Sequence, residues 1–182
     1  MLMAVFCLGA SLIGINAQEK DWANLQRYAQ QNAELPKPDK NEKRVVFMGN
    51  SITEGWVNTH PDFFKSNGYI GRGIGGQTSY QFLVRFREDV INLSPALVVI
   101  NAATNDIAEN TGAYHEDRTF GNIVSMVELA KANHIKVILT TTLPAAAFGW
   151  NPAIKDAPQK IASLNARLKA YAQTNKIPFV DY

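Results

Sequence analysis

The sequence predicts a doubly wound α/β domain, in which a parallel sheet lies between two layers of helices. Two observations predict this fold. Short runs of apolar and β-branched residues recur along the chain, and segments with helical spacing of apolar residues separate them. The runs are apolar on both faces, as strands are when helices cover both sides of a parallel sheet. A chain of 182 residues, 46% of them hydrophobic, is long enough to bury one such core.

The predicted strands begin with Arg44 to Met48, a short apolar run that stops at Gly49. The second run has the weakest pattern, and the last is the shortest. In chain order, the remaining strands are predicted at Tyr69 to Arg72, Ala96 to Asn101, Ile135 to Thr140 and Pro178 to Val180.

Helical patterns fill the spaces between these strands. They run from Tyr80 to Val90, from Phe120 to Lys131 and from Ala157 to Ala172. A further amphipathic pattern, Asp21 to Leu35, precedes the first strand and ends at Pro36 and Pro38. Because strand and helix alternate, a ligand is expected to bind beyond the carboxyl ends of the strands.

The first 17 residues are almost all apolar or small, and a polar run follows them. The segment is short for a membrane span and is typical of a secretory signal peptide cut after Ala17; a buried N-terminal helix is the alternative. Phe6 precedes Cys7 at a position where lipid attachment usually needs a small residue. We therefore expect a secreted or periplasmic protein without a stable membrane anchor.

Composition excludes several classes of function. The net charge of +2 comes from 18 basic and 16 acidic residues without a basic block, so nucleic acid is not an expected partner. The single cysteine, Cys7, allows neither a disulfide framework nor a cysteine-based zinc site. No metal and no cofactor are expected.

Three motifs each follow one of three successive strands. GNSIT (residues 49–53) places Ser51 at a turn from strand to helix, where it is either a nucleophile or a helix N-cap. GIGGQT (residues 73–78) either brings backbone amides close to a ligand or forms an ordinary turn. TND (residues 104–106) carries Asn105, which either faces the ligand or caps the next helix. Because parallel strands end at one edge, the motifs should converge there.

The motifs GNSIT, GIGGQTS and ATND, in this order and spacing, resemble the first three sequence blocks of the SGNH (GDSL-like) hydrolases. Many members are esterases, lipases or lysophospholipases. The resemblance covers residues 44–182 and implies a three-layer sandwich with a flavodoxin-like parallel sheet. It implies that Ser51 is the nucleophile, and that its amide, the Gly76 amide and the Asn105 side chain form the oxyanion hole. Such preorganised donors stabilise the negative charge of an acyl-transfer intermediate.

Two residues depart locally from the family pattern. Asn50 stands where the namesake motif has Asp, which indicates a different subfamily rather than a loss of activity. Ala103 stands where a glycine is usual, and its methyl group is expected to narrow the pocket or tilt Asn105. The second departure should affect rate more than function.

A larger departure concerns the general base. The family carries an Asp-x-x-His block beyond the last strand, and His60, His115 and His134 all lack an Asp three residues earlier. We expect these histidines on the surface and leave Asp181 unassigned. Because an unactivated serine is a weak nucleophile, residues 1–182 should be nearly inert. We interpret them as a fragment that lacks this block and a final helix.

The expected function is that of a serine ester hydrolase acting on a small acyl ester. The predicted organisation is a signal peptide (1–17), an N-terminal helix and linker (18–43) and a hydrolase domain (44–182). With export and the TEGW sequence after Ser51, the family resemblance points to acetyl esters of carbohydrates, while lysophospholipid and thioester substrates stay open. Oligomeric state stays open too.

Other interpretations remain. Three aromatic residues are predicted in loops at the rim of the site, namely Trp56, Phe148 and Trp150. They form a sugar platform or a wall of the acyl pocket, or they simply pack beneath a loop. A non-catalytic carbohydrate-binding module on the same scaffold is the main alternative to an enzyme. A dinucleotide site at GRGIGG (residues 71–76) is disfavoured, because no acidic residue follows at the required distance.

Overall fold

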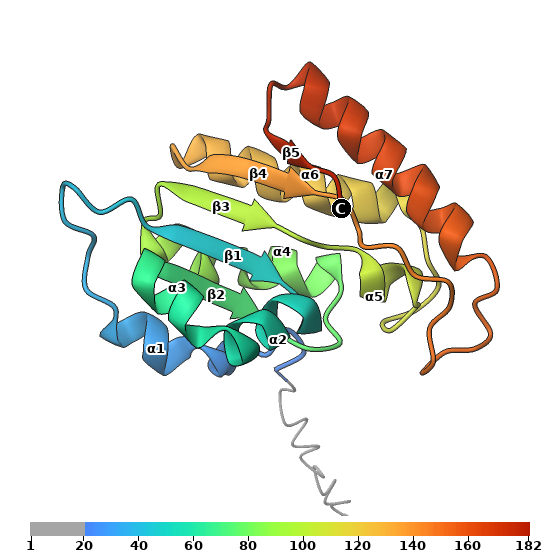
Figure 1. Cartoon of the computed structure of the whole chain (residues 1–182), viewed down its shortest axis with the longest axis horizontal. Coiled ribbons are helices and arrows are strands. Elements are labelled where there is room, and N and C mark those ends of the chain that lie inside the picture. The colour runs from blue at the N-terminus through green and yellow to red at the C-terminus, as the bar shows by residue number, and fades with distance from the viewer. Residues whose placement is uncertain (1–20) are drawn as a thin grey trace, which may run out of the picture.

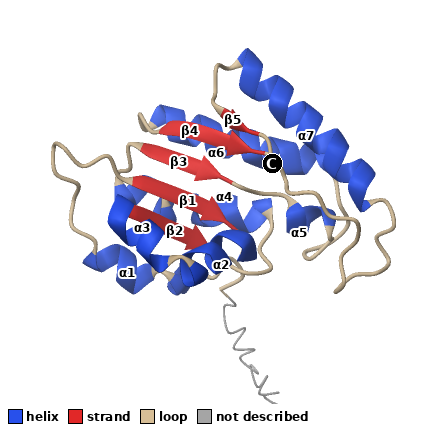
Figure 2. Cartoon of the chain, in the orientation of Figure 1, coloured by secondary structure: helices blue, strands red, loops and turns tan. Residues whose placement is uncertain are grey.

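The computed structural model describes residues 21–182, and five strands form one parallel sheet in the order β2-β1-β3-β4-β5 (Figures 1 and 2). The chain runs from β1 outward to β2, then crosses back over β1 to β3. This is the doubly wound, flavodoxin-like order that the sequence predicts. The strands are β1 (Val45–Gly49), β2 (Tyr69–Gly73), β3 (Leu97–Ile100), β4 (Lys136–Thr140) and β5 (Phe179–Val180).

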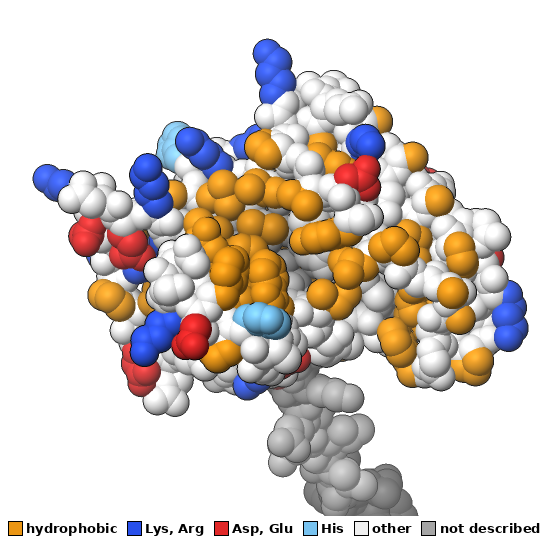
Figure 3. Space-filling model, in the orientation of Figure 1, with side chains coloured by type: hydrophobic (Ala, Val, Ile, Leu, Met, Phe, Trp, Pro, Cys, Tyr) orange, Lys and Arg blue, Asp and Glu red, His pale blue; other side chains and the backbone are white. Residues whose placement is uncertain are grey.

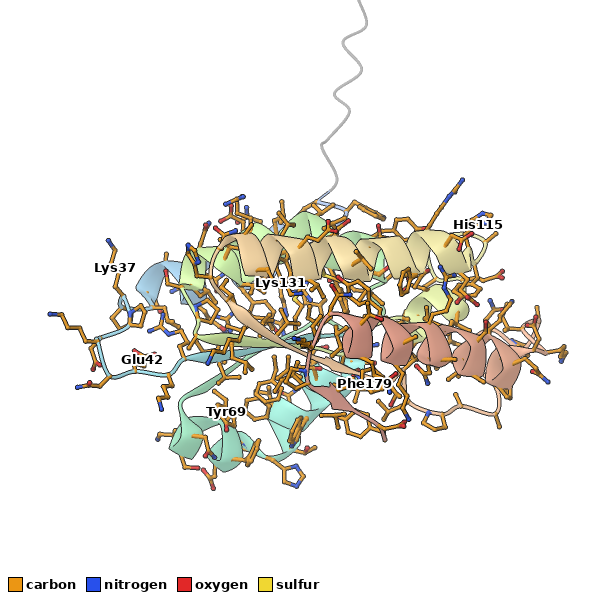
Figure 4. All side chains as sticks on the ribbon, turned by 90° about the horizontal axis from the view of Figure 1, so that it is seen from above. Lys37, Glu42, Tyr69, His115, Lys131 and Phe179 are labelled. Atoms are coloured by element: carbon orange, nitrogen blue, oxygen red, sulfur yellow. The ribbon has the colours of Figure 1, made fainter. Side chains whose placement is uncertain are left out.

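Helices flank the sheet on both sides. α4 (Ser79–Asp89) and α6 (Glu116–Ala132) cover one face, and α7 (Ala157–Thr174) packs beside α6 and along β5. α2 (Ser51–Thr59) and α3 (Pro61–Asn67) lie on the other face over β1 and β2, so the sheet is sandwiched when viewed edge-on (Figure 4). Short elements complete the fold, namely η1 (Leu25–Arg27), α1 (Ala29–Glu34), η2 (Ile91–Leu93) and α5 (Thr104–Ile107).

The main core lies between the sheet and the layer of α4 and α6. Successive residues of a strand point to opposite faces. Alternate residues of β1, β3 and β4 are therefore buried against the aromatic and aliphatic residues of these helices. The strand residues are Val46, Met48, Val98, Ile100, Val137 and Leu139, and the helix residues include Phe82, Phe86, Ile123, Met126 and Val127.

A second apolar cluster lies on the opposite face, where five aromatic rings from β1, α2, α3 and β2 pack edge to face or stack. They belong to Phe47, Trp56, Phe63, Phe64 and Tyr69. The rest of this face is less covered, and its strand side chains Val99 and Ile138 are half-buried. Hydrophobic side chains gather there on the surface (Figure 3).

The predicted strands are confirmed, with ends that differ by at most one residue. The single helix predicted over Asp21 to Leu35 is wrong. Asn24, at φ 54°, and Tyr28 break the segment into η1 and α1 because the segment follows the surface of the β2 edge. α3 lies in a stretch for which no helix is predicted. The predicted signal peptide lies outside the described residues.

No helix within residues 21–182 combines the length and the apolar character that a membrane span requires.

Candidate active site

Ser51 is the first residue of α2 and lies just beyond the carboxyl end of β1. The N-cap of this helix is Asn50, whose Oδ1 accepts a hydrogen bond from the Ile52 amide at 3.0 Å. Ser51 is therefore not the cap, and its exposed hydroxyl makes no hydrogen bond within residues 21–182. Because Ser51 is the first residue of the helix, its own backbone amide has no hydrogen-bond acceptor within the helix.

Two glycines allow β1, β2 and α2 to approach closely. A Cβ atom on Gly73 would overlap the amide of Glu54 and would lie 2.6 Å from the carbonyl oxygen of Asn50. A Cβ atom on Gly49 would overlap the Thr53 side chain. The start of α2, and with it Ser51, therefore sits directly against the ends of the two strands.

The glycine-rich loop that follows β2 lies alongside Ser51. A Cβ atom on Gly75 would lie 3.8 Å from the Ser51 Cβ, an ordinary contact distance. The Gly75 amide donates to Oε2 of Glu54 at 2.8 Å. Gly76 has φ 75°, a backbone conformation that favours glycine. Within residues 21–182 its amide donates to no acceptor, so it is available to a ligand.

Asn105 follows β3 in α5, and its side chain is only 3% exposed. Nδ2 donates one hydrogen to the carbonyl oxygen of Gln77 at 2.9 Å, which leaves the second hydrogen of the amide group available. Asn110 ties the same elements together. Its side chain donates to the Gly76 carbonyl at 3.0 Å, and its backbone amide donates to the Asn105 carbonyl at 3.0 Å.

The structure thus brings the three predicted site residues to one edge of the sheet. Ser51 follows β1 and Asn105 follows β3, so the two residues flank the switch point between these neighbouring strands, where ligands bind in doubly wound folds. Three of the four buried side-chain atoms without a hydrogen-bond partner in residues 21–182 lie at this edge: Nδ2 of Asn50, Oδ1 of Asn101 and Oγ1 of Thr104. Buried polar atoms normally have a hydrogen-bond partner, so a group of such atoms at one edge calls for an explanation such as a catalytic role or a bound water or ion.

A buried arginine fixes the strand ends beneath this edge. Arg85 of α4 is fully buried, and its guanidinium donates to the carbonyl oxygens of Gly49 and Arg72, at 3.1 and 2.8 Å. It also donates to Gln77 Oε1 at 2.6 Å and pairs with Asp89 at 2.7 Å. Burial lowers the pKa of Arg85, and the Asp89 carboxylate opposes that shift. The sequence alone does not reveal this role, because Arg85 looks like one polar residue of an amphipathic helix.

The N-terminal segment, residues 21–35, braces the glycine-rich loop. The Tyr28 hydroxyl donates to the Gly73 carbonyl, and the Ala23 carbonyl accepts from Gln77 Nε2 at 2.7 Å. Arg27 pairs with Glu54 at 3.0 Å. Burial raises the pKa of Tyr28, which keeps the hydroxyl protonated as a donor. Sequence analysis treats this segment as a helix before a linker and misses its contacts with the site.

The backbone conformation of Ala103 explains why a glycine is usual at this position. It precedes α5 with φ 81°, in the left-handed region that strains any residue with a Cβ atom. Next to Asn105, Asp106 is buried and accepts hydrogen bonds from the Ser79 amide at 2.9 Å, the Ser79 hydroxyl and the Thr119 hydroxyl. Burial raises the pKa of Asp106, while these hydrogen bonds oppose the shift.

None of the three histidines contacts Ser51. His60 caps the far end of α2, about 13 Å along a nine-residue helix at 1.5 Å per residue. His115 is exposed at the beginning of α6 (Figure 4). His134 lies two residues before the start of β4, at the opposite, amino edge of the sheet. Asp181 follows β5 and pairs with Lys169 at 2.9 Å.

The described residues hold no group of three His, Cys, Asp or Glu side chains that could bind a metal ion. A small apolar cavity of about 180 Å³ adjoins the start of α2, and its lining includes Phe47, Ile52, Trp56 and Leu143. The three aromatic residues predicted at the rim differ in their surroundings. The predicted loop position is wrong for Trp56, which lies within α2 and belongs to the aromatic cluster. Phe148 and Trp150 do lie in a loop, between β4 and α7, where Phe148 is 1% exposed and Trp150 is 62% exposed.

A parallel α/β sheet with a serine, a glycine-rich loop and an asparagine at its carboxyl edge defines a class of acyl-transferring hydrolase. Residues 47–182 match the GDSL-like Lipase/Acylhydrolase family, and the chain belongs to this family.

Two solved structures from Bacteroides are closely similar. A candidate acylhydrolase of Bacteroides fragilis is 99% identical over 90% of this chain and 79% of its own, with a TM-score of 0.89. A GDSL-like lipase of Bacteroides thetaiotaomicron is 79% identical over 88% of this chain and 78% of its own, with a TM-score of 0.87. The Bacillus subtilis lipoprotein YqeF is 32% identical over 117 residues, 55% of this chain. The match spans about half of YqeF, 48% of its length.

Proposed function

We propose that the protein is a serine ester hydrolase in which Ser51 is the nucleophile. The main support for this proposal is the arrangement of residues at the carboxyl edge of the sheet. The Ser51 hydroxyl, without a hydrogen-bond partner in residues 21–182, lies beside the Gly75–Gly76 loop, and the loop is tied to the Asn105 amide through Gln77 and Asn110.

In the proposed reaction, Ser51 Oγ attacks the acyl carbonyl carbon while a general base removes the hydroxyl proton. The carbonyl oxygen becomes an oxyanion that accepts hydrogen bonds from the amides of Ser51 and Gly76 and from Asn105 Nδ2. The intermediate collapses when the protonated base gives its proton to the departing alcohol. Water then releases the acyl group from Ser51 by the reverse sequence of proton transfers.

The base in this proposal is none of the three histidines. His60 and His134 lie at the wrong ends of their elements, and His115 is an exposed residue at the start of α6. The family resemblance assigns the base to an Asp-x-x-His block, and residues 1–182 contain no such sequence. The chain of residues 1–182 should therefore hydrolyse esters very slowly.

The proposed substrate has a short acyl group and is met outside the cytoplasm. The cavity of about 180 Å³ beside the start of α2 has room for an acetyl group, and its lining is mostly apolar. The apolar leader of residues 1–17 supports export, as does the similarity to a bacterial lipoprotein. Acetylated carbohydrates fit these features better than lysophospholipids.

The test compares four proteins on 4-nitrophenyl acetate. They are residues 1–182, the same chain with Ser51→Ala, a chain lengthened by the Asp-x-x-His block of the family, and the lengthened chain with Ser51→Ala. Only the lengthened chain with Ser51 should turn over the ester and react with a fluorophosphonate probe.

Two results would contradict the proposal. If the lengthened chain turns over ester no faster than its Ser51→Ala variant, the protein is not a serine hydrolase, and the alternative of a non-catalytic binding module gains support. If residues 1–182 already turn over the ester faster than their own Ser51→Ala variant, one of the three histidines is the base.

A further inference from the structure

The most exposed large apolar side chain in residues 21–182 is that of Trp150, at 62%. It lies in the loop between β4 and α7. Two contacts nevertheless hold it in place. Nε1 donates to Oδ1 of Asn110 at 2.9 Å, and the indole packs on the buried ring of Phe148 with 5.2 Å between ring centroids. An indole that is exposed and also fixed loses little conformational entropy when a ligand binds to it.

The loop around Trp150 is itself anchored. Asn151 Nδ2 donates to the Ala108 carbonyl at 2.9 Å, and the Asn151 amide donates to the Phe148 carbonyl at 3.0 Å. Ile154 is buried in the main core. A Cβ atom on Gly149 would have no neighbour within 4 Å, so the space beside Trp150 on that side is open.

Trp150 is connected to the proposed oxyanion hole through one residue. The Asn110 side chain accepts from Trp150 through Oδ1 and donates to the Gly76 carbonyl through Nδ2 at 3.0 Å. The amide that donates into the proposed hole and the exposed indole are thus both positioned by Asn110. A substrate whose carbonyl lies at Gly76 would extend its remaining part over the rim near Trp150.

The chemistry of this rim fits a sugar ring. A pyranose presents C–H groups on its faces and hydroxyl groups around its edge, so it needs a flat apolar surface with polar neighbours. The indole supplies the surface, and the exposed side chains of Asn110 and Thr111 supply polar groups. The Lys160 ammonium pairs with two carboxylates, that of Asp156 at 3.0 Å and that of Glu109 at 3.6 Å, so it offers no unpaired positive charge to a phosphate headgroup.

Neither of the other predicted rim aromatics offers such a surface. Trp56 stacks on Phe63 with 5.2 Å between centroids, and Phe148 is buried beneath Trp150 itself. A long acyl chain, in turn, would require an enclosed apolar groove rather than one exposed ring.

We infer that Trp150, held by Asn110, is a stacking platform for the carbohydrate part of an acylated sugar. This inference rests on the proposed function and deepens it, since it assigns the alcohol side of the ester to a pyranose ring.

The platform is tested first by binding, which requires no hydrolysis. Residues 1–182 are titrated with unacetylated xylotetraose, cellotetraose and mannotetraose, and tryptophan fluorescence is recorded. At least one sugar should give a saturable change. Trp150→Ala should weaken binding at least tenfold, whereas Trp150→Phe should keep part of it because a flat ring remains. The control is Trp22→Phe, which changes another exposed tryptophan, 48% exposed, and should leave the affinity unaltered.

A second measurement uses the lengthened chain and the ratio of kcat/KM for acetylated xylotetraose to that for 4-nitrophenyl acetate. Trp150→Ala should lower this ratio at least tenfold, mainly through KM.

If no tetrasaccharide binds saturably at tens of millimolar, or if Trp150→Ala binds as tightly as the parent, the platform is overturned. A selective loss of activity on long-chain esters in Trp150→Ala would also overturn it. If binding depends on Trp150 but neither ester is hydrolysed, the hydrolase proposal fails and the platform stands.

Discussion

The Glu54 carboxylate on α2 accepts a hydrogen bond from the Gly75 amide at 2.8 Å, so the helix that carries Ser51 also holds the loop that carries Gly76. Glu54→Ala removes this link and the ion pair with Arg27. We expect turnover of the lengthened chain to fall about tenfold, because a small displacement of one oxyanion donor weakens the stabilisation of the intermediate. The control is Glu128→Ala, which changes an exposed residue of α6. Equal kcat values for the two variants would contradict the prediction.

Asn105→Ala in the lengthened chain should lower kcat about a hundred- to a thousand-fold, the usual effect of removing one oxyanion donor. KM should change much less, because the lost hydrogen bond forms chiefly in the transition state. Steady-state kinetics on 4-nitrophenyl acetate provide the measurement. An unaltered kcat would remove Asn105 from the proposed mechanism.

Tyr28→Phe should lower the free energy of unfolding by about 1 to 2 kcal/mol, because the buried Gly73 carbonyl loses its donor. Tyr171→Phe is a matched control, since the hydroxyl of Tyr171 donates no hydrogen bond within residues 21–182. Urea unfolding measures the two values. Amide hydrogen exchange at Gly75, whose amide donates to Glu54 in this loop, should become faster in Tyr28→Phe alone. An unchanged exchange rate would mean that the segment 21–35 does not brace the loop.

Ala103→Gly should raise the free energy of unfolding by about 0.5 to 1 kcal/mol. The left-handed backbone at φ 81° is strained by about 1 to 2 kcal/mol when a Cβ atom is present, and the added entropy of an unfolded glycine offsets part of the gain. Thermal or urea denaturation checks the sign. A loss of stability would show that packing of the buried methyl group outweighs the strain.

Asp106 should make stability fall as pH rises. Burial raises the folded-state pKa of Asp106 above its unfolded value of about 3.9, so the folded protein binds the proton more tightly. Its contribution is fully present below that pH and is lost as pH rises through the folded-state pKa. The difference in unfolding free energy between the parent and Asp106→Asn isolates this effect and should decrease upward from about pH 4. A difference that increases with pH would show that the hydrogen bonds from Ser79 and Thr119 dominate over burial.

The strands could be predicted from the sequence because a parallel sheet buried on both faces leaves continuous apolar runs, and β1, β3 and β4 are such runs. The edge to which Ser51 and Asn105 belong follows from the same topology. What the sequence could not reveal depends on tertiary contacts. α3 lies between Pro61 and Gly68 and is too short for a clear period, and the segment 21–35 bends to reach β2 and its loop. The hydrogen bond that Asn50 accepts from Ile52 and the one that Asn110 donates to Gly76 likewise depend on the three-dimensional structure.

The buried guanidinium of Arg85 has a consequence for the order in which the molecule folds. Its carbonyl partners are Gly49, the last residue of β1, and Arg72, the last but one of β2, and they come together only once β1 and β2 have paired. Before pairing, Arg85 keeps its water, since a buried charge without acceptors is strongly unfavourable. We therefore expect the strand ends to close around Arg85 late and in one cooperative step. Interactions that form after the transition state act on the unfolding rate, so substitutions of Arg85 should speed unfolding and leave refolding almost unaltered.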